Sequence, residues 1–417
     1  MTAKPIDIPK SAVWEAYKIV SNNRGASGID AQSIKDFDKD LENNLYKIWN
    51  RMSSGSYFPQ PVKRVQIPKK QGGTRNLGVP TVSDRIAQTV VKLHLEPKLD
   101  PIFHQNSYGY RPKKSALDAV NITRSRCWKK DWVVEFDIRK AFDSLDWNLL
   151  RKALRKHVSE KWVLMYIDRW LTAPIVATDG AIVKPTRGVP QGSVIGPILM
   201  NLFMHYAFDM WMDRENPNCR FARYADDAVV HCSSLAQAEK LLSDLDNRLK
   251  ECGLEIHPDK SKIVYCKDTN RPGNYPNIAF TFLGFTFRPR YARGGHRDGR
   301  AFTGFQPAVS NEAMKAMRAE IRSWKLHRRS DLSLEYIAVY CNPVIQGWWN
   351  YYSRFYKREM LLGVIQYFHK KLMQWARRKY RKLKGRQKAS RDWLIRATQK
   401  APKLLFSARL ISMPLAG

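Results

Sequence analysis

Apolar and polar residues follow one another along the chain with the two periods that distinguish helices from strands. Apolar stripes at helical spacing predict helices over residues 11–52 (in two pieces), 84–99, 115–129, 146–157, 160–171, 198–212 and 235–252. Short apolar runs bounded by turn residues predict strands over 133–138, 263–266 and 280–287, and hairpins over 62–79, around Thr178–Gly180 and over 221–232. Beyond a Gly/Arg-rich link over 291–304 the pattern is helical again. The mixture predicts an α+β fold.

Two adjacent aspartates, Asp226 and Asp227, interrupt the apolar run 221–232. The run has the pattern of two short strands that turn on Ala225 and Asp226. Neighbouring carboxylates repel each other by roughly 3 kcal/mol at an effective dielectric constant of about 20 unless a cation lies between them. The residues alone leave two interpretations open, a metal site and a solvated hairpin tip.

A third carboxylate, Asp137, stands at the exit of the apolar strand 133–138 and needs a partner there. Asp143 and Asp146 follow it, but both have an ordinary use as helix caps. A sheet could bring Asp137 to Asp226 and Asp227. Two divalent cations held there would stabilise the attacking and leaving oxygens of a phosphoryl transfer. Oxygen ligands favour Mg²⁺, with Mn²⁺ as a substitute, and no His/Cys set has zinc spacing.

Basic and aromatic residues around these carboxylates suit a nucleoside triphosphate. Lys69 and Arg75, in the basic, glycine-rich tip of the hairpin 62–79, could neutralise its phosphates, although a solvated basic turn is the alternative. Arg85 opens the helix 84–99, which Asp84 is expected to cap, on the side that the hairpin would face. The ring of Phe142 would lie under the sugar and leave no room for a 2′-hydroxyl. Gln191, in the stiff loop 186–197, can donate hydrogen bonds to a ligand.

Three shorter features keep a structural alternative. The connector Asn23–Asp30 contains two glycines, for which a simple turn is the favoured interpretation. In the loop 107–112, Tyr108, Tyr110 and Arg111 could stack on a nucleic-acid strand or serve the fold alone. Gly284, inside the predicted strand 280–287, suggests close approach by another backbone.

The charge of the chain indicates a polyanionic partner. The 417 residues, enough for two or three domains, carry 72 Lys and Arg against 38 Asp and Glu, a net charge of +34. Nucleic acid fits better than a membrane, since no run of about 18 apolar residues and no signal-peptide pattern occurs. Thirteen Trp and 18 Tyr offer stacking surfaces for bases. Six cysteines without zinc or disulfide spacing indicate a reduced, cytosolic protein.

The carboxyl-terminal region is the most basic part of the chain. Arg377, Arg378 and Lys382 belong to a cluster of basic residues interleaved with Trp375 and Tyr380. A cluster of this kind is often only a solvated face, but its length and its aromatic residues favour a groove for nucleic acid.

The order of these motifs resembles that of reverse transcriptases of bacterial group II introns, along nearly the whole chain. The similar segments are Tyr224–Asp227 (catalytic box), Phe136–Leu145 (first carboxylate motif), Arg187–Gly192 (template and nucleotide loop), Gly25–Asp30 (amino-terminal extension), Phe282–Phe285 (primer grip) and Asn342–Tyr352 (maturase-specific thumb). The last is the most specific, because retroviral and telomere enzymes lack it. Ser193 and Gly196 depart from the family, which commonly has Gly and Ser there.

The resemblance implies a right-hand polymerase, with fingers, a palm with an antiparallel catalytic sheet, an all-helical thumb/maturase domain and a basic tail. The expected boundaries are 1–55 (amino-terminal helices), 56–290 (fingers and palm), 291–304 (link), 305–375 (thumb) and 376–417 (tail). It implies that Asp137, Asp226, Asp227 and the Ile138 carbonyl hold the metals, and that Lys262 approaches the nucleotide pocket. The further residues expected to bind nucleic acid are Tyr224, Ala225, Leu283, Gly284, Trp348 and Tyr351.

The implied function is an RNA-directed DNA polymerase that extends a primer 3′-hydroxyl with dNTPs on an RNA template. It would also bind a structured intron RNA, assist its splicing and act on target DNA in retrohoming, in the bacterial cytosol and at the nucleoid. Alternatives are a host-adopted reverse transcriptase, an RNA-binding splicing factor with little polymerase activity and a two-metal nuclease, although a nuclease has no use for Phe142. Without Cys pairs for a zinc-bearing endonuclease domain, second-strand cleavage is not expected.

Overall fold

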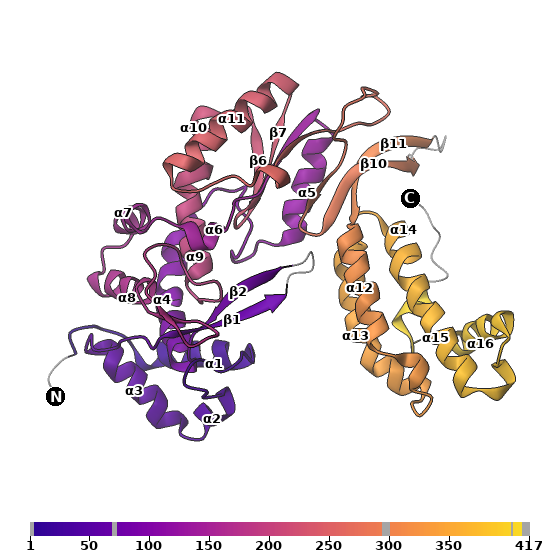
Figure 1. The fold of residues 1–417 in the computed structure, drawn as a ribbon, viewed down its shortest axis with the longest axis horizontal. Coiled ribbons are helices and arrows are strands. Elements are labelled where there is room, and N and C mark those ends of the chain that lie inside the picture. Colours follow the sequence, from indigo (N-terminus) through magenta and orange to yellow (C-terminus); the bar gives the residue numbers. More distant parts are fainter. Residues whose placement is uncertain (1–3, 69–72, 294–300, 402, 411–417) are drawn as a thin grey trace. The chain divides into compact units, whose positions relative to one another are not determined.

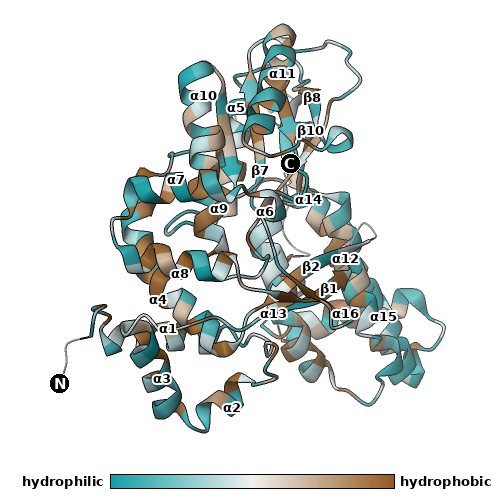
Figure 2. Ribbon diagram, turned by 60° about the vertical axis from the view of Figure 1, so that its left-hand side comes forward, coloured by the Kyte–Doolittle hydropathy of each residue, from teal (hydrophilic) through white to brown (hydrophobic). Residues whose placement is uncertain are grey.

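The computed structural model describes residues 4–68, 73–293, 301–401 and 403–410 (Figure 1). By its contacts the chain divides into two compact units, one of Met1–Ala119 with Val134–Lys262 and the other of Val120–Val133 with Ile263–Gly417. We describe each unit by itself. Hydrophilic and apolar residues alternate along the helices, as Figure 2 shows in teal and brown. No helix of the described ranges is long and apolar enough to cross a membrane.

The first unit combines helices with short strands. Its helices are α1 (Lys10–Asn22), α2 (Ile34–Asp38), α3 (Leu41–Ser53), α4 (Val82–Leu99), α6 (Ala141–Ser144), α7 (Trp147–His157), α8 (Lys161–Leu171), α9 (Gly196–Met204), α10 (Met210–Glu215) and α11 (Leu235–Glu251). Its strands are β1 (Val62–Pro68), β2 (Thr74–Val79), β4 (Ile175–Val176), β5 (Ile182–Val183), β6 (Arg220–Tyr224), β7 (Asp227–Cys232) and most of β3 (Trp132–Phe136). A π-helical turn, His205–Asp209, joins α9 to α10.

These strands form two sheets, and the three predicted hairpins, over 62–79, around Thr178–Gly180 and over 221–232, are confirmed. One sheet has the order β2-β1-β4-β5, and in the other β7 lies between β6 and β3. In the first sheet β1 and β2 are antiparallel, with Ile67 opposite Arg75, and β1 runs parallel to β4. In the second sheet β6 and β7 are antiparallel, with Tyr224 opposite Asp227.

Two capping predictions have opposite outcomes. Asp146 caps α7, because its side chain accepts a hydrogen bond from the Leu149 amide at 2.9 Å. Asp84 does not cap α4, which begins earlier than predicted. Thr81 is the N-cap, and its hydroxyl accepts from the Asp84 amide at 3.1 Å. The Asp84 side chain is buried and instead accepts from the Tyr57 hydroxyl at 2.7 Å, which ties α4 to the segment before β1.

The second unit consists of a β-hairpin region and a helical region. Its helices are α12 (Asn311–Ser323), α13 (Leu334–Tyr352), α14 (Lys357–Met360), α15 (Gln366–Lys379), α16 (Gln387–Lys400) and the greater part of α5 (Ala116–Cys127). Its strands are β8 (Lys262–Tyr265), β9 (Phe280–Phe282), β10 (Phe285–Arg293) and β11 (Ala301–Val309), and the last three form a sheet of order β11-β10-β9.

Two predictions for this region are wrong. The segment 280–287 is not one strand, because Leu283 (φ 51°) and Gly284 (φ 80°) make a two-residue turn between β9 and β10. The ends of the predicted link 291–304 are strand residues, since Tyr291 lies opposite Thr303 and Arg293 opposite Ala301 in the β10–β11 ladder. Pro289 is tolerated in β10 because β9 pairs only with residues 285–287, which leaves β10 a single neighbour at that point.

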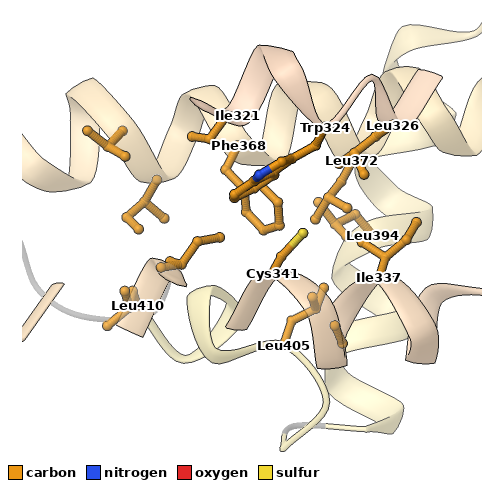
Figure 3. Close-up of a cluster of buried hydrophobic side chains, with 14 of the residues drawn as sticks. Ile321, Trp324, Leu326, Ile337, Cys341, Phe368, Leu372, Leu394, Leu405 and Leu410 are labelled. Carbon is orange, nitrogen blue, oxygen red and sulfur yellow. The ribbon is translucent and has the colours of Figure 1, made fainter. Parts of the chain in front are cut away.

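The helices of the second unit share one apolar core, which includes the region predicted to be a tail. In this core the side chains of Trp324, Cys341 and Phe368 point toward one another (Figure 3), with the Trp324 and Phe368 rings 5.9 Å apart. Leu394 and Leu405 are buried in the same core. The basic segment after residue 376 therefore contributes α16 to the packed helical region.

Candidate active site

The hairpin of β6 and β7 has the geometry that its sequence predicts. Ala225 and Asp226 form the turn between Tyr224 and Asp227, and Ala225 is buried with a φ of 59°. A non-glycine residue in this left-handed region is strained, so surrounding contacts must hold it. Asp226 is the second residue of the turn and is partly buried, and Asp227 begins β7.

The loop 106–110 supplies some of these contacts. The Tyr108 amide donates to the Arg223 carbonyl at 2.8 Å, and the Arg223 amide donates to the Asn106 carbonyl at 2.9 Å. Gly109 lies so close that a Cβ there would be 2.4 Å from the Ala225 nitrogen. This segment therefore supports the turn. Arg111 serves the fold, because its guanidinium donates to Asp100 at 2.7 Å and to the Ser107 carbonyl at 3.0 Å. Unlike Tyr108, Tyr110 is exposed, and the centroid of its ring lies 6.0 Å from that of Tyr224.

A buried ion pair supports the turn from below. Arg223 and Asp209 are both fully buried, and the guanidinium donates to the two carboxylate oxygens at 2.7 and 2.5 Å. Its Nη1 also donates to the Ala225 carbonyl at 2.8 Å and to Asn201 at 3.1 Å. Asn201 in turn donates to the Gly109 carbonyl at 2.7 Å. The sequence analysis did not predict a role for Asn201, Asp209 or Arg223, the three polar residues of this network.

Asp137 lies at the end of β3, as predicted, and is held by the segment 256–261. Its carbonyl accepts from the His257 amide at 2.8 Å, and its amide donates to the Ser261 hydroxyl at 3.3 Å. Its carboxylate accepts from Lys260 at 2.7 Å, a partner that the sequence did not indicate. Ile138 lies opposite Ile256 in an antiparallel bridge whose hydrogen bonds are made by the residues on either side of them. The Ile138 carbonyl therefore points away from the segment 256–261.

The structure brings Asp137 and Asp226 within electrostatic reach of each other. Burial raises the pKa of Asp226, the charge of Asp137 raises it further, and its own backbone hydrogen bond and the charges of Arg75 and Arg223 lower it. No group of three or more His, Cys, Asp or Glu among the described residues is already arranged to hold a metal ion. The residues nevertheless fit a divalent cation, because a positive charge between two mutually repelling, partly desolvated carboxylates relieves both penalties.

The predicted nucleotide residues Arg75 and Gln191 meet. Arg75 Nε donates to the Gln191 side-chain oxygen at 2.5 Å, and the Gly78 amide donates to the Gln191 carbonyl at 2.6 Å. Beside them is a cavity of about 500 Å³. Its charged lining comprises Asp143 and Arg187, both named in the sequence analysis, and Arg64, Lys140 and Lys184, which were not predicted. Burial raises the pKa of Asp143, and Lys140, Arg64 and Arg75 lower it. Lys69 lies outside the described residues.

Phe142 lies on α6, directly against the loop that carries Gln191. Its carbonyl accepts from the Val189 amide at 2.7 Å, and the Gly188 amide donates to the Leu145 carbonyl at 2.8 Å. The Phe142 side chain is almost fully buried, which means that only a small part of its ring is open to a ligand. Phe142 is thus bonded through its backbone to the loop that carries Gln191, and Gln191 accepts from Arg75.

Two predicted nucleotide residues have other partners. Arg85 donates to the Ala26 carbonyl at 2.7 Å, in the glycine connector. That connector is more than a turn, because a Cβ at Gly28 would be 2.6 Å from the Thr81 backbone at the start of α4. Lys262 lies 3.4 Å from the Glu135 carboxylate, on β3. The contacts of Arg85 and Lys262 are therefore explained by the fold, and a role for either in nucleotide binding stays a prediction.

The remaining predicted residues lie in the second unit and also have contacts within it. The Tyr351 hydroxyl donates to the Leu283 carbonyl at 3.0 Å, and a Cβ at Gly284 would be 3.0 Å from the Tyr352 hydroxyl. The β9–β10 turn is thus fixed on the end of α13. Trp348 stacks on Trp324, with ring centroids 6.1 Å apart. Arg378 and Lys382 are exposed and Arg377 is partly buried, around the end of α15.

Comparison with known proteins gives two family matches. Residues 67–287 match the family described as reverse transcriptase (RNA-dependent DNA polymerase), and residues 314–393 match the group II intron maturase-specific domain. A further comparison, with apo telomerase from Candida Tropicalis, gives a TM-score of 0.44 at 16% identity over 58% of this chain and 59% of that one, too low to carry an argument.

Relatives of known sequence agree with these matches. The chain is 30% identical to protein YkfC of Escherichia coli over 324 residues, which cover 67% of this chain and 81% of YkfC. It is 31% identical to the group II intron-encoded protein LtrA of Lactococcus lactis over 65% of this chain and 46% of LtrA. It is 27% identical to the putative COX1/OXI3 intron 2 protein of Saccharomyces cerevisiae over 60% of this chain and 34% of that protein. The chain thus spans less than half the length of the last two.

Proposed function

The chain belongs to the reverse transcriptase (RNA-dependent DNA polymerase) family and contains a group II intron maturase-specific domain, and from this premise we propose how its residues act. The proposed reaction joins the 3′-hydroxyl of a primer to the α-phosphorus of a dNTP on an RNA template, with pyrophosphate as the leaving group. The observation that carries the proposal is the β6–β7 turn, which presents Asp226 to the charges of both Asp137 and Arg75. The charge of Arg75 near Asp226 supports a triphosphate site beside these carboxylates.

Asp137, Asp226 and Asp227, with the Ile138 carbonyl, would hold two divalent cations, Mg²⁺ in preference and Mn²⁺ as a substitute. When bound, the cations supply charge stabilisation for the attacking and leaving oxygens. Lys260 is the nearest protein cation to Asp137, at 2.7 Å, and must release or share that carboxylate when metal binds. Because Lys260 is half exposed, its release has a small cost.

The nucleotide is bound by the chain's own cationic wall. Arg75, held by Gln191, neutralises phosphate oxygens, and Arg64 and Lys140 of the neighbouring cavity extend the positive field. Phe142, whose backbone carbonyl accepts from the Val189 amide, would exclude a 2′-hydroxyl by the volume of its ring. Lys69, Arg85 and Lys262 are secondary candidates for nucleotide binding, since Arg85 contacts the Ala26 carbonyl and Lys262 contacts Glu135.

The maturase-specific match favours a second role, the binding of a structured group II intron RNA to assist its splicing and its mobility into target DNA. The net charge of +34 supports a polyanionic partner, and Arg377, Arg378 and Lys382 at the end of α15 offer exposed or partly exposed cations for it. The β9–β10 turn at Leu283 and Gly284 would contact the primer, with Tyr351 as its support.

Substitution Asp226→Ala tests the polymerase role. We expect loss of Mg²⁺-dependent primer extension on an RNA template, with RNA binding retained. Asp246→Ala, on the exposed side of α11, is the matched control and should extend normally. Normal extension by Asp226→Ala would refute the proposed site. Absence of extension by the unaltered chain on every primer–template pair, with tight RNA binding, would favour a splicing factor with an idle polymerase fold.

A further inference from the structure

The second unit contains a cavity of about 630 Å³ to which neither family match nor the proposed reaction gives a role. It lies between α5, the β10–β11 hairpin, the loop 268–270 and the segment that follows α13. The lining side chains used below are Arg124, Trp128, Phe302, Gln306 and Phe355. Such a volume accommodates a planar group of the size of a nucleobase.

Two aromatic faces and one arginine dominate the cavity. The rings of Trp128 and Phe302 are 46% and 41% exposed, high fractions for such large apolar side chains. The Arg124 guanidinium lies 4.4 Å from the Trp128 ring and 5.8 Å from the Phe355 ring. Exposed aromatic rings beside an arginine are the surfaces on which unpaired bases stack.

These groups are held in place before any ligand arrives. The Trp128 indole donates to the Phe305 carbonyl at 3.1 Å, and Arg124 Nε donates to the Gln306 side-chain oxygen at 2.9 Å. The loop 268–270 is tied to β11, because the Thr269 amide donates to the Thr303 carbonyl at 3.0 Å. A preformed arrangement avoids the entropy cost of ordering these side chains on binding.

Gly304 keeps the cavity open. Residues 302, 304 and 306 share one face of β11, because side chains alternate along a strand. A Cβ at Gly304 would lie 3.2 Å from both the Phe302 ring and the Gln306 amide nitrogen. The absence of a side chain therefore leaves room between an aromatic face and a hydrogen-bond donor. The amide nitrogen can donate to an acceptor on the edge of a base, and the terminal nitrogens of Arg124 can do the same.

We propose that this cavity binds a single unstacked nucleobase, held between the aromatic faces of Trp128 and Phe302 and recognised at its edge by Gln306 and Arg124. The proposal rests on the proposed function, which makes nucleic acid the partner of the chain. The base comes either from a single-stranded segment of bound RNA or from a free nucleotide, two sources with the same chemistry.

Photocrosslinking with the full-length protein tests the proposal. The probe is a 12-nucleotide oligouridylate with one 4-thiouridine, and crosslinked peptides are mapped by mass spectrometry. We expect crosslinks within 124–128 or 302–306. Gly304→Leu, which fills the cavity, should reduce them by roughly fivefold or more, the factor that corresponds to one lost stacking contact. Phe302→Ala removes an exposed face, and it should give the same loss with little risk to folding.

Tyr291→Ala is the matched control. Tyr291 is 49% exposed on the same hairpin, but its neighbour Ala292 lines the cavity, so alternation points Tyr291 to the opposite face. Its crosslinking should equal that of the unaltered chain. Crosslinks confined to other segments, or crosslinks at 124–128 and 302–306 that neither Gly304→Leu nor Phe302→Ala reduces, would overturn the proposal.

Two competitors identify the source of the base. If excess uridine monophosphate abolishes the crosslinks, the cavity binds a free nucleotide; if only unlabelled oligouridylate does so, it binds a base within a strand. Primer extension is measured in parallel and should be unchanged in Gly304→Leu. A chain that crosslinks in the cavity but never extends a primer supports the base site and contradicts the polymerase role, so the two failures are distinguishable.

Discussion

Breaking the buried ion pair under the β6–β7 turn, which carries the proposed catalytic carboxylates, should reduce both stability and primer extension. Asp209→Asn keeps the shape of the side chain but removes the negative charge that pairs with Arg223, which is fully buried. An amide also turns one acceptor into a donor, so one of the two hydrogen bonds at 2.7 and 2.5 Å becomes a donor–donor contact. His205, 3.9 Å from Asp209, cannot replace the lost negative charge, because an imidazole is either neutral or positively charged.

The expected magnitude follows from burial. Removing one partner of a fully buried pair leaves an uncompensated charge and costs about 3–5 kcal/mol of unfolding free energy. Asp246→Asn makes the same chemical change in an exposed pair with Lys250, whose side chains are 35% and 61% exposed, and should cost less than about 1 kcal/mol. Arg223→Met should cost as much as Asp209→Asn, because it leaves Asp209 charged and unpaired.

Urea unfolding and primer extension together separate the two roles of the pair. The double substitution Asp209→Leu with Arg223→Met removes both charges and should recover much of the stability lost in either single variant. It should not recover activity, because the Ala225 carbonyl still lacks the donor that holds it at 2.8 Å, and a displaced turn can cost up to about 100-fold in rate. Equal unfolding midpoints for Asp209→Asn and Asp246→Asn would refute the energetic argument. Full activity in the double variant would show that Arg223 serves the fold alone.

Two further predictions concern the side chains of Phe142 and His369. Phe142→Leu should raise the ratio of kcat/KM for ribonucleotides to that for deoxyribonucleotides, because a smaller side chain at this position leaves room for a 2′-hydroxyl. An unchanged ratio would place the discriminating group elsewhere. His369 is buried against Ser407, and burial lowers its pKa from 6.5 to about 4. Between pH 6.5 and pH 4, His369 is protonated in the unfolded chain but neutral in the folded one. The free energy of unfolding should therefore fall by roughly 3 kcal/mol as the pH is lowered from above 6.5 toward 4. His369→Gln should flatten this part of the curve in urea unfolding, and an equally steep curve in that variant would contradict the assignment.

The sequence predicts the hairpin of the site because all its signals are local. Strand-forming residues on both sides of Ala225 and Asp226 fix the turn, and the adjacent carboxylates are visible without any knowledge of the fold. The helices 235–252 and 84–99 are predicted nearly to their ends for the same reason, since each carries its own periodicity. The position of Lys260 on Asp137 is different, because it depends on residues more than 120 positions apart.

The β10–β11 hairpin could not be predicted from local pattern alone. Pro289 and Pro307 lie in the two strands, and proline normally argues against a strand interior. Both are accommodated because Pro307 is on the edge strand β11 and Pro289 lies beyond the end of β9. Only the order of strands in the sheet shows this. A Gly/Arg-rich composition therefore suggested a link where the chain forms two strands and one wall of a cavity.

The polar network under the turn left a signal that periodicity could have shown. Asn201, His205 and Asp209 are spaced four residues apart in an otherwise apolar helical segment, so they lie on one face of it. A charged side chain in the middle of a buried strand, Arg223, requires a buried counter-charge, and Asp209 is a carboxylate on that polar face. The two observations together predict the pair. Gly109 left no such signal, because its role is a backbone contact with Ala225, and a contact between two backbones is visible only once the chain is folded.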